Sequence, residues 1–201
     1  MTSVSNKSIT TIADLLNIFI NEKDKLSETE NLEFEIKFGT KKIKKIKKEH
    51  FDNVIKYLLS NGFLMSEENQ YYLNVSFETL RVKINGIANV QDYCKNGIIN
   101  TEKDIGAIEF MEKKQFGLPN GSPAIVNIDD FNLRASISNE NKLEKDFPAI
   151  EKLLKDWNKY KKYNRLINRY TLTKDGFPIK IDLSIVKETP DIGKTFRDIN
   201  L

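Results

Sequence analysis

The sequence predicts an α+β protein in which an antiparallel β-sheet curls into a closed barrel, with about three helices packed on its apolar outside. Three observations favour this fold. Several segments alternate charged and apolar residues, three others carry apolar residues at helical spacing, and the charged positions mix both signs. Inside a barrel such charges could pair with one another or with a bound ligand.

Length and composition restrict the possible classes of protein. With 201 residues the chain is long enough for one sizeable domain, and we expect residues 1–201 to form a single one. Its net charge is only +3, from 32 basic and 29 acidic residues, so any attraction for polyanions must come from where the charges lie. Cys94 and His50 are each the only residue of their kind, which excludes a disulfide framework and histidine- or cysteine-rich metal sites. A metal could still bind to carboxylates alone.

Neither a membrane span nor a signal peptide is predicted. No apolar run approaches the ~20 residues that cross a bilayer. The N-terminus MTSVSNKSITT lacks the basic-then-apolar order of a secretory signal. We therefore expect a cytosolic protein without a membrane partner.

Apolar residues at helical spacing predict three helices, at residues 9–24, 49–62 and 148–157. Thr11 and Asp14 form a capping pair at the start of the first helix. Gly62 suits the end of the second helix, and Pro148 suits the first turn of the third. Stretches rich in Gly, Asn and Pro are predicted as loops: residues 85–90, 117–124 and 174–178.

The segment NLEFEIKFGT, residues 31–40, is the clearest predicted strand. Its charged residues occupy every second position and share one face: Glu33, Glu35 and Lys37. The apolar residues between them, Leu32, Phe34 and Ile36, share the other face and are expected in the core.

The same alternation recurs in five further segments, at residues 77–86, 107–115, 130–140, 164–172 and 180–186. Tyr71 and Tyr72 are placed on an edge strand, where they could stack on bases or pack on neighbouring side chains. Each strand taken alone also fits a simpler interpretation, a sheet with one face in water. Closure would instead enclose charges of both signs, which a polyphosphate and a divalent cation together could satisfy.

Glu33-Phe-Glu35-Ile-Lys37 resembles the ExExK motif of the triphosphate tunnel metalloenzymes, whose eight-stranded antiparallel barrel surrounds a triphosphate. Other segments resemble one branch of that family, the metal-dependent RNA 5'-triphosphatases of fungal and large DNA virus capping enzymes, including the N-terminal domain of mimivirus-type enzymes. These segments are LRVKING, FMEKKQFG, FNLRASISNE, NRYTL and IDLSIVKE. The resemblance covers most of residues 30–200.

The resemblance implies site residues on the charged faces. Glu33 and Glu35 would bind Mg²⁺ or Mn²⁺, with Lys37 beside them on the tunnel floor. The implied phosphate contacts are Arg81, Lys83, Lys113, Arg134, Arg165, Arg169 and Lys180. The implied catalytic set is Glu33, Glu35, Lys37, Arg134, Arg169 and Asp182. Asp182 would bind the metal through water or orient a basic side chain, and Glu140 would position the attacking water.

The implied reaction removes the γ-phosphate from the 5'-triphosphate end of nascent mRNA, the first step of capping. The partners would be 5'-triphosphorylated RNA or free NTP, together with fused or associated guanylyltransferase and methyltransferase domains, in a host cytoplasm or a virion. Two alternatives stay open. One is a tripolyphosphatase or nucleoside triphosphatase of the same fold, and the other is a noncatalytic module that binds polyphosphate.

Two features of the sequence fall outside this pattern. The family supplies a second Glu-x-Glu pair from a late strand, but none follows Lys187, so we expect the chain to be truncated before its last strands. The run KKIKKIKK at residues 41–48 could contact RNA or form the solvated flank of a helix. A cysteine phosphatase is not expected, since Cys94 lacks a glycine-rich loop and an arginine after it.

Overall fold

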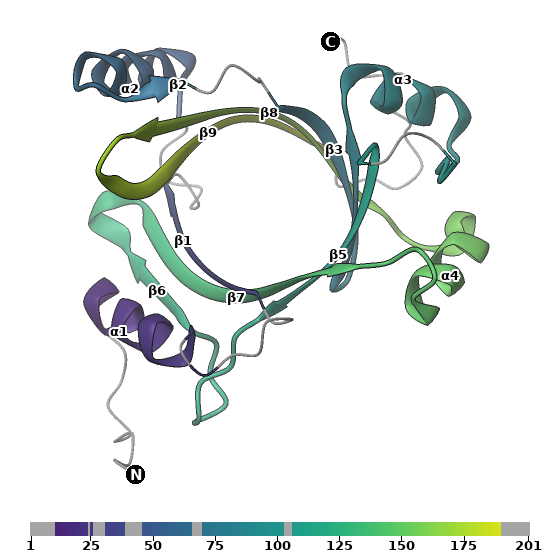
Figure 1. The fold of residues 1–201 in the computed structure, drawn as a ribbon, viewed down its shortest axis with the longest axis horizontal. Coiled ribbons are helices and arrows are strands. Elements are labelled where there is room, and N and C mark those ends of the chain that lie inside the picture. The colour runs from purple at the N-terminus through teal and green to yellow at the C-terminus, as the bar shows by residue number, and fades with distance from the viewer. Residues whose placement is uncertain are drawn as a thin grey trace. The chain divides into compact units, whose positions relative to one another are not determined.

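The computed structural model describes residues 11–23, 25, 31–38, 46–65, 70–102 and 106–189 (Figure 1). These residues form a mixed α+β fold. The helices are α1 (Ile12–Lys23), α2 (Lys48–Ser60), α3 (Ile87–Asn96) and α4 (Pro148–Lys155), with 3₁₀ helices η1 (Asp129–Phe131) and η2 (Trp157–Lys159). The strands are β1 (Leu32–Phe38), β2 (Leu64–Met65), β3 (Gln70–Phe77), β4 (Leu80–Asn85), β5 (Ile108–Gln115), β6 (Ile125–Ile128), β7 (Leu133–Leu143), β8 (Tyr163–Lys174) and β9 (Phe177–Thr189). No helix in these ranges is long and apolar enough to cross a membrane.

The chain divides into two compact units. The first contains Met1–Ile46 and Glu112–Asn141, and the second contains Lys47–Met111 and Lys142–Leu201. The chain passes from one unit to the other between Ile46 and Lys47, within β5, and near the end of β7. Both units combine antiparallel strands with helices.

In the first unit, β7 pairs on its two sides with β1 and β6. Ala135 and Ile137 of β7 are fully buried and pack in one cluster with Leu15 of α1. The rings of Phe19 in α1 and Phe34 in β1 are 5.7 Å apart between centroids. The apolar face of these strands is therefore buried under α1, which leaves the charged face on the other side of the same strands.

Two expectations for this unit have different outcomes. The capping pair is confirmed, because the backbone N–H of Asp14 donates to Thr11 Oγ1 at 3.1 Å and the Thr11 hydroxyl donates to the Asp14 carboxylate at 2.8 Å. The expected burial of Ile36 is wrong, since this side chain is 41% exposed. The ring contact with α1 is made by Phe34, and Ile36 lies beyond it along β1.

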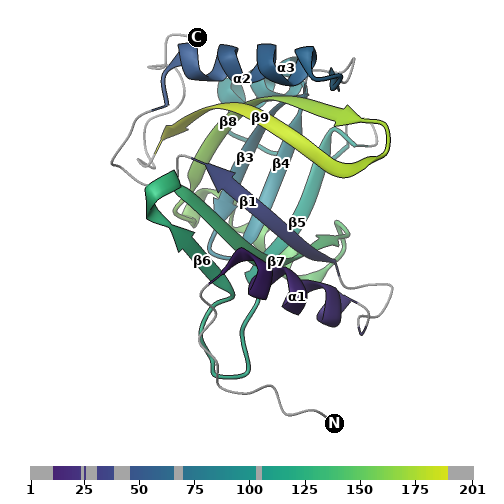
Figure 2. The same cartoon turned by 90° about the vertical axis from the view of Figure 1, so that its left-hand side faces the viewer.

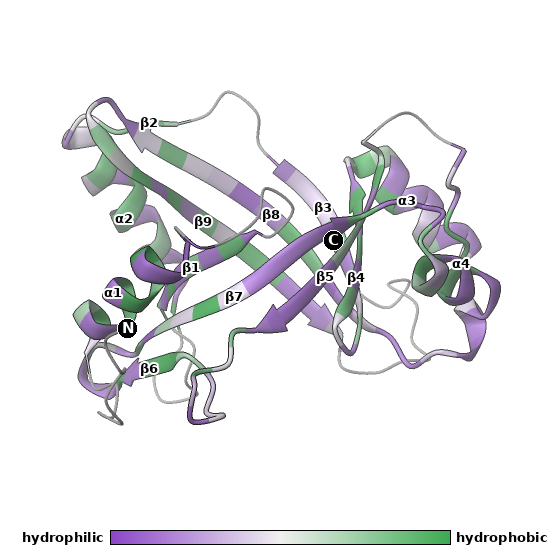
Figure 3. Cartoon of the chain, turned by 60° about the horizontal axis from the view of Figure 1, so that its bottom comes forward, coloured by the Kyte–Doolittle hydropathy of each residue, from purple (hydrophilic) through white to green (hydrophobic). Residues whose placement is uncertain are grey.

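In the second unit, β3 lies between β4 and β8, and β8 also pairs with β9 and β2. Figure 2 shows β3 and β4 side by side, with β8 and β9 next to each other. The placement of Tyr71 and Tyr72 on an edge strand is wrong, because β3 is paired on both sides. Figure 3 shows the alternation of hydrophilic and hydrophobic residues along β8 and β9 that the sequence pattern predicts.

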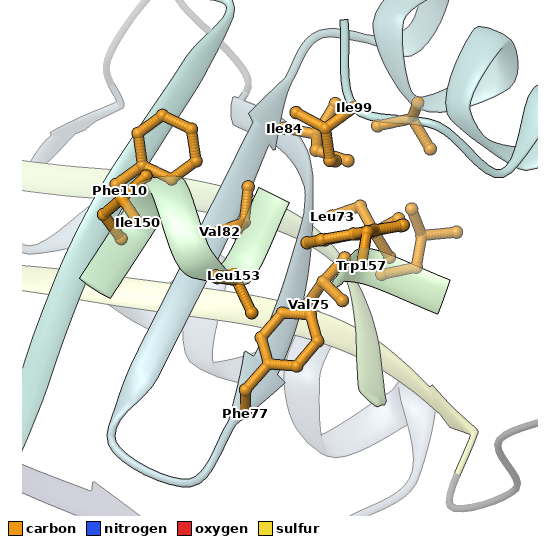
Figure 4. Close-up of a cluster of buried hydrophobic side chains, with 12 residues drawn as sticks. Leu73, Val75, Phe77, Val82, Ile84, Ile99, Phe110, Ile150, Leu153 and Trp157 are labelled. Atoms are coloured by element: carbon orange, nitrogen blue, oxygen red, sulfur yellow. The ribbon is translucent and has the colours of Figure 1, made fainter. Parts of the chain in front are cut away.

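The apolar face of this second group of strands packs against α3, α4 and η2 (Figure 4). Val75 and Val82 are fully buried, and Ile150 and Leu153 of α4 pack in the same cluster. Trp157 joins the cluster and donates its indole N–H to a backbone carbonyl oxygen, that of Gly97, at 3.1 Å. This bond satisfies the one polar atom that the tryptophan brings into the core.

Helix α3 was not expected, because the sequence around Gly86 predicts a loop. The helix lies between two glycines with positive φ, Gly86 at 82° and Gly97 at 71°. Gly97 provides the left-handed C-cap, and its N–H donates to the Tyr93 carbonyl at 2.7 Å. Glycines that punctuate a short helix resemble loop glycines in the sequence alone.

Other predicted boundaries are confirmed. Pro148 begins α4, and α2 ends immediately before Asn61 and Gly62. Of the lysine run, positions 41–45 lie outside the described residues, and Lys48 pairs with Asp52 at 2.5 Å in the first turn of α2. The described end of the run is therefore the solvated flank of a helix.

From this packing we predict how much the side chain of Leu153 contributes to the stability of the second unit. Leu153→Ala should lower the free energy of unfolding by about 2–5 kcal/mol, because its side chain is only 2% exposed and its removal leaves a cavity. The same change at Leu64, which is 66% exposed, should cost less than about 0.5 kcal/mol. Urea denaturation of both variants measures the difference, and equal losses would contradict this description of the core.

Candidate functional site

Three carboxylates of the first unit converge on a single ammonium group. We define the acidic cluster as Glu33, Glu35, Glu140 and the lysine that they surround, Lys113. The Nζ atom of Lys113 lies 2.6 Å from Glu33 Oε2, 3.0 Å from Glu140 Oε1 and 3.7 Å from Glu35 Oε2. Residues from β1, β5 and β7 thus meet at one point, although they are far apart in the sequence.

Strand register explains why these residues meet. Glu33 lies directly opposite Ser138 in the β1–β7 pair, and Glu35 lies opposite Ser136. Small residues opposite the glutamates leave room for longer side chains to approach from β5. The hydroxyl of Ser138, which is buried, donates to Glu33 at 3.4 Å.

The ionisation of Lys113 is set by opposing effects. Burial lowers the pKa of this ammonium, but its hydrogen bond to Glu33 and the charge of Glu140 outweigh burial, so the pKa lies above its ordinary value of 10.5. Lys37 provides a second cation, 2.6 Å from Glu35 Oε2. The cluster therefore holds fixed negative charge with ammonium groups as counterions.

The donor set of the acidic cluster suits a hard divalent cation, because carboxylate oxygens are the ligands that Mg²⁺ prefers. Within the described ranges, no three carboxylate, imidazole or thiolate groups form a metal site by themselves. Mg²⁺ is commonly held by one or two carboxylates and completed by substrate phosphates and water. Glu33 and Glu35 fit a site of that kind.

The second unit carries most of the predicted phosphate contacts on one face of neighbouring strands. We define the basic face by its cations: Arg81 and Lys83 on β4, Arg165 and Arg169 on β8, and Lys180 on β9. In the β3–β4 and β3–β8 pairs, Asn74 lies opposite both Lys83 and Arg165, which puts these two cations on the same side of the sheet.

Two acidic residues of β9 hold the arginines of β8. Arg165 Nε lies 2.9 Å from Glu188, and Arg169 Nη1 lies 3.1 Å from Asp182. Each carboxylate is itself fixed by a hydroxyl, since Tyr163 donates to Glu188 at 2.6 Å and Thr171 donates to Asp182 at 2.7 Å. Both arginines are therefore oriented by cross-strand partners before any ligand binds.

The cations of β4 have different surroundings. Lys83 donates to Glu109 of β5 at 3.3 Å, and the same carboxylate accepts a hydrogen bond from Asn85 at 2.6 Å. Arg81 lies opposite Ser76 of β3. Lys180 is exposed on β9.

Arg134 belongs to the first unit. It lies opposite Lys37 in the β1–β7 pair, and its Nε donates to Asn127 of β6 at 2.9 Å. The structure thus distributes the predicted site residues in two groups: Glu33, Glu35, Lys37, Lys113 and Arg134 in one unit, and Arg81, Lys83, Arg165, Arg169, Lys180 and Asp182 in the other.

Several partners of these cations were not expected from the sequence. They are Glu109, Asn127 and Glu188, each of which holds one predicted phosphate contact. Glu109 and Glu188 occupy the same alternate positions of their strands as Lys113 and Asp182, so strand periodicity alone could have indicated them. Predicting Asn127 as the partner of Arg134 would have required the register of the β6–β7 pair, which the sequence does not reveal.

Cys94 has no place in this chemistry. Burial raises the pKa of its thiol, whereas a nucleophilic cysteine needs a lowered one.

Comparison with known proteins finds similarity in structure alone. No family model and no curated protein matches the sequence. The fold is similar to that of a viral RNA triphosphatase domain. It comes from a trifunctional mimivirus mRNA capping enzyme, with a TM-score of 0.58 and 18% identity, over 94% of this chain and 85% of that chain. A triclinic structure of the mimivirus capping enzyme triphosphatase gives a TM-score of 0.55, also at 18% identity.

The resemblance proposed from the sequence is confirmed at the level of the fold. At 18% identity the similarity to the mimivirus domain covers nearly the whole chain. The expectation of truncation concerns the chain after Lys187, and the described residues end at position 189.

From the acidic cluster we predict that the stabilising contribution of Lys113 decreases at alkaline pH. Lys113→Met should lower the free energy of unfolding by about 1–3 kcal/mol at neutral pH, because three carboxylates lose their shared counterion. The pKa of Lys113 is raised by folding, so its contribution is complete below the ordinary value of 10.5 and is lost as the pH rises through the folded value.

Chemical denaturation of both proteins from about pH 7 to pH 11 measures this contribution. The difference in the free energy of unfolding between the wild type and Lys113→Met should become smaller toward pH 11. All other ionisable groups are common to both proteins, so their effects largely cancel in the difference. A difference in unfolding free energy that stays constant with pH would contradict the described role of the Lys113 ammonium group.

Proposed function

We propose that this chain is a metal-dependent RNA 5'-triphosphatase, which removes the γ-phosphate from the 5'-triphosphate end of nascent mRNA. The observation that carries the proposal is the combination of an acidic cluster suited to a hard cation with a basic face of oriented arginines and lysines. The similarity in fold to the RNA triphosphatase domain of a mimivirus capping enzyme supports it. The products would be a diphosphate RNA end and inorganic phosphate.

The basic face would bind the phosphate oxygens. Arginine presents its N–H groups in a planar fork that matches phosphate geometry. Arg165 and Arg169 would therefore fix the orientation of the bound triphosphate. Asp182 and Glu188 already orient them at 3.1 Å and 2.9 Å, so little side-chain freedom would be lost on binding. Lys83 would add a cation from β4, on the other side of β3.

The acidic cluster would hold the metal through Glu33 and Glu35. Mg²⁺ or Mn²⁺, when bound, would supply positive charge to the terminal phosphoryl oxygens. The cations of the chain would stabilise the same developing charge, because phosphoryl transfer spreads negative charge over those oxygens. Glu140, the third carboxylate near Lys113, would orient the attacking water.

The proposal includes closure of the strands into the eight-stranded barrel expected from the resemblance. A triphosphate could engage both groups of residues only if the acidic cluster and the basic face line one tunnel. Fused or associated capping domains would then act on the diphosphate end that this reaction produces.

The role of the carboxylates can be tested by phosphate release. Glu33→Gln and Glu35→Gln should each lower Mg²⁺- or Mn²⁺-dependent phosphate release from triphosphate-ended RNA by about 100-fold or more, because each removes a charged metal ligand. Glu112→Gln is the matched control, since it lies on the opposite face of β5 from Lys113 and should keep its activity.

The same assay separates the proposal from its alternatives. Release from free NTP or tripolyphosphate that exceeds release from triphosphate-ended RNA would indicate a small-molecule triphosphatase. Absence of release with any metal, combined with ligand binding that survives both glutamate substitutions, would indicate a noncatalytic binding module.

The basic face makes an independent prediction about binding. Arg169→Ala should weaken equilibrium binding of tripolyphosphate by about 10- to 100-fold, because one charge-assisted contact is lost. Lys152→Ala is the control of equal charge change, since Lys152 lies in α4, on the helical side of the strands. Titration calorimetry should show near wild-type affinity for that control. Equal losses in the two variants would mean that binding depends on net charge alone.

A further inference from the structure

Tyr72 is a buried aromatic residue among the cations of the basic face. It lies on β3, the strand between β4 and β8, and only 3% of it is exposed. Lys83 Nζ lies 5.0 Å from its ring centroid, and Arg169 Cζ lies 5.5 Å from the same centroid. One ring thus contacts a cation from each neighbouring strand.

Each of these cations also has a carboxylate within reach. Lys83 lies 3.3 Å from Glu109, and Arg169 lies 3.1 Å from Asp182. Both cations are therefore held between an acidic group and the ring of Tyr72. The carboxylate and the aromatic ring differ in how many N–H donors of the cation they leave available for a ligand.

A carboxylate neutralises a cation and occupies its N–H donors, whereas an aromatic face attracts the charge without accepting those hydrogen bonds. A cation held by the ring keeps donors for a bound anion. The Nε atom of Arg169 is buried and has no hydrogen-bond acceptor among the described residues. The Arg169 side chain as a whole is 34% exposed, so a ligand could reach its outer N–H groups.

The phenol itself adds no negative charge to this surface at neutral pH. Burial raises the pKa of Tyr72, and the lowering effect of Arg169 does not outweigh it. The ring therefore acts on its neighbours as a neutral aromatic surface.

We propose that Tyr72 is a positioning residue for polyphosphate binding, whose ring holds Lys83 and Arg169 on the basic face with hydrogen-bond donors directed to the ligand. The inference rests on the proposed function of this face as a phosphate site. It adds a residue that neither charge pattern nor motif selects for this role, and it assigns the role to the ring and not to the hydroxyl group.

The test compares two substitutions of this tyrosine by titration calorimetry with tripolyphosphate. Tyr72→Leu removes the ring and should weaken binding roughly tenfold, because both cations lose their aromatic partner. Tyr72→Phe keeps the ring and should bind within about twofold of wild type. Tyr170→Leu is the control for loss of an aromatic residue, since Tyr170 lies on the other face of β8 and its ring contacts Phe51.

A double-mutant cycle then separates positioning from a general loss of stability. The effects of Tyr72→Leu and Arg169→Ala on tripolyphosphate affinity should be non-additive, because the two residues act through one contact. The effects of Tyr72→Leu and Lys180→Ala should add. If Tyr72 had a merely structural role, the effects would be equally additive in both cycles. Tyr170→Leu would then weaken tripolyphosphate binding as well.

The outcomes distinguish this inference from the proposed function. Non-additivity confined to Arg169, together with rescue by Tyr72→Phe, supports it even if no phosphate is released. Wild-type affinity in Tyr72→Leu overturns the inference while the proposed function stands. Failure of the wild-type protein to bind tripolyphosphate overturns both.

Discussion

Pairing of charges between neighbouring strands is the constraint on which this structure depends. An ionised side chain can be packed on one face of a sheet only when a counterion compensates its lost hydration. In the first unit, three carboxylates share the ammonium of Lys113. In the second, Asp182 and Glu188 each hold one arginine of β8. The hydrophobic cores under α1, α3 and α4 free the opposite faces of the strands to carry these charges.

Both groups of charges already have partners of opposite sign on neighbouring strands. Arg165 and Arg169 are already fixed by carboxylates that are fixed in turn by hydroxyl groups. Arginines that are already oriented lose little side-chain freedom when a further anion binds. In the acidic cluster, carboxylates that now surround an ammonium have the chemistry to surround a divalent ion. The similarity to a viral RNA triphosphatase domain concerns the fold that carries these charges.

Much of the fold could be predicted because its signals are local. Alternation assigned Glu33 and Glu35 to the charged face of β1, and helical spacing with a capping pair located α1. Helix α3 was missed because its flanking glycines resemble those of a loop, and the edge position of Tyr72 was wrong because strand order is not local information. The partners of the cations required register, which depends on pairing between distant segments. Periodicity could therefore indicate which face a residue occupies, but not which side chain lies opposite.

The most direct test is a crystal structure of the protein with Mn²⁺ and tripolyphosphate, with the metal located by its anomalous scattering. The account predicts a manganese peak bound by carboxylate oxygens of Glu33 and Glu35, at about 2.2 Å. It predicts further that tripolyphosphate contacts Arg165 and Arg169. A manganese peak remote from both glutamates, or a tripolyphosphate bound away from these arginines, would contradict it.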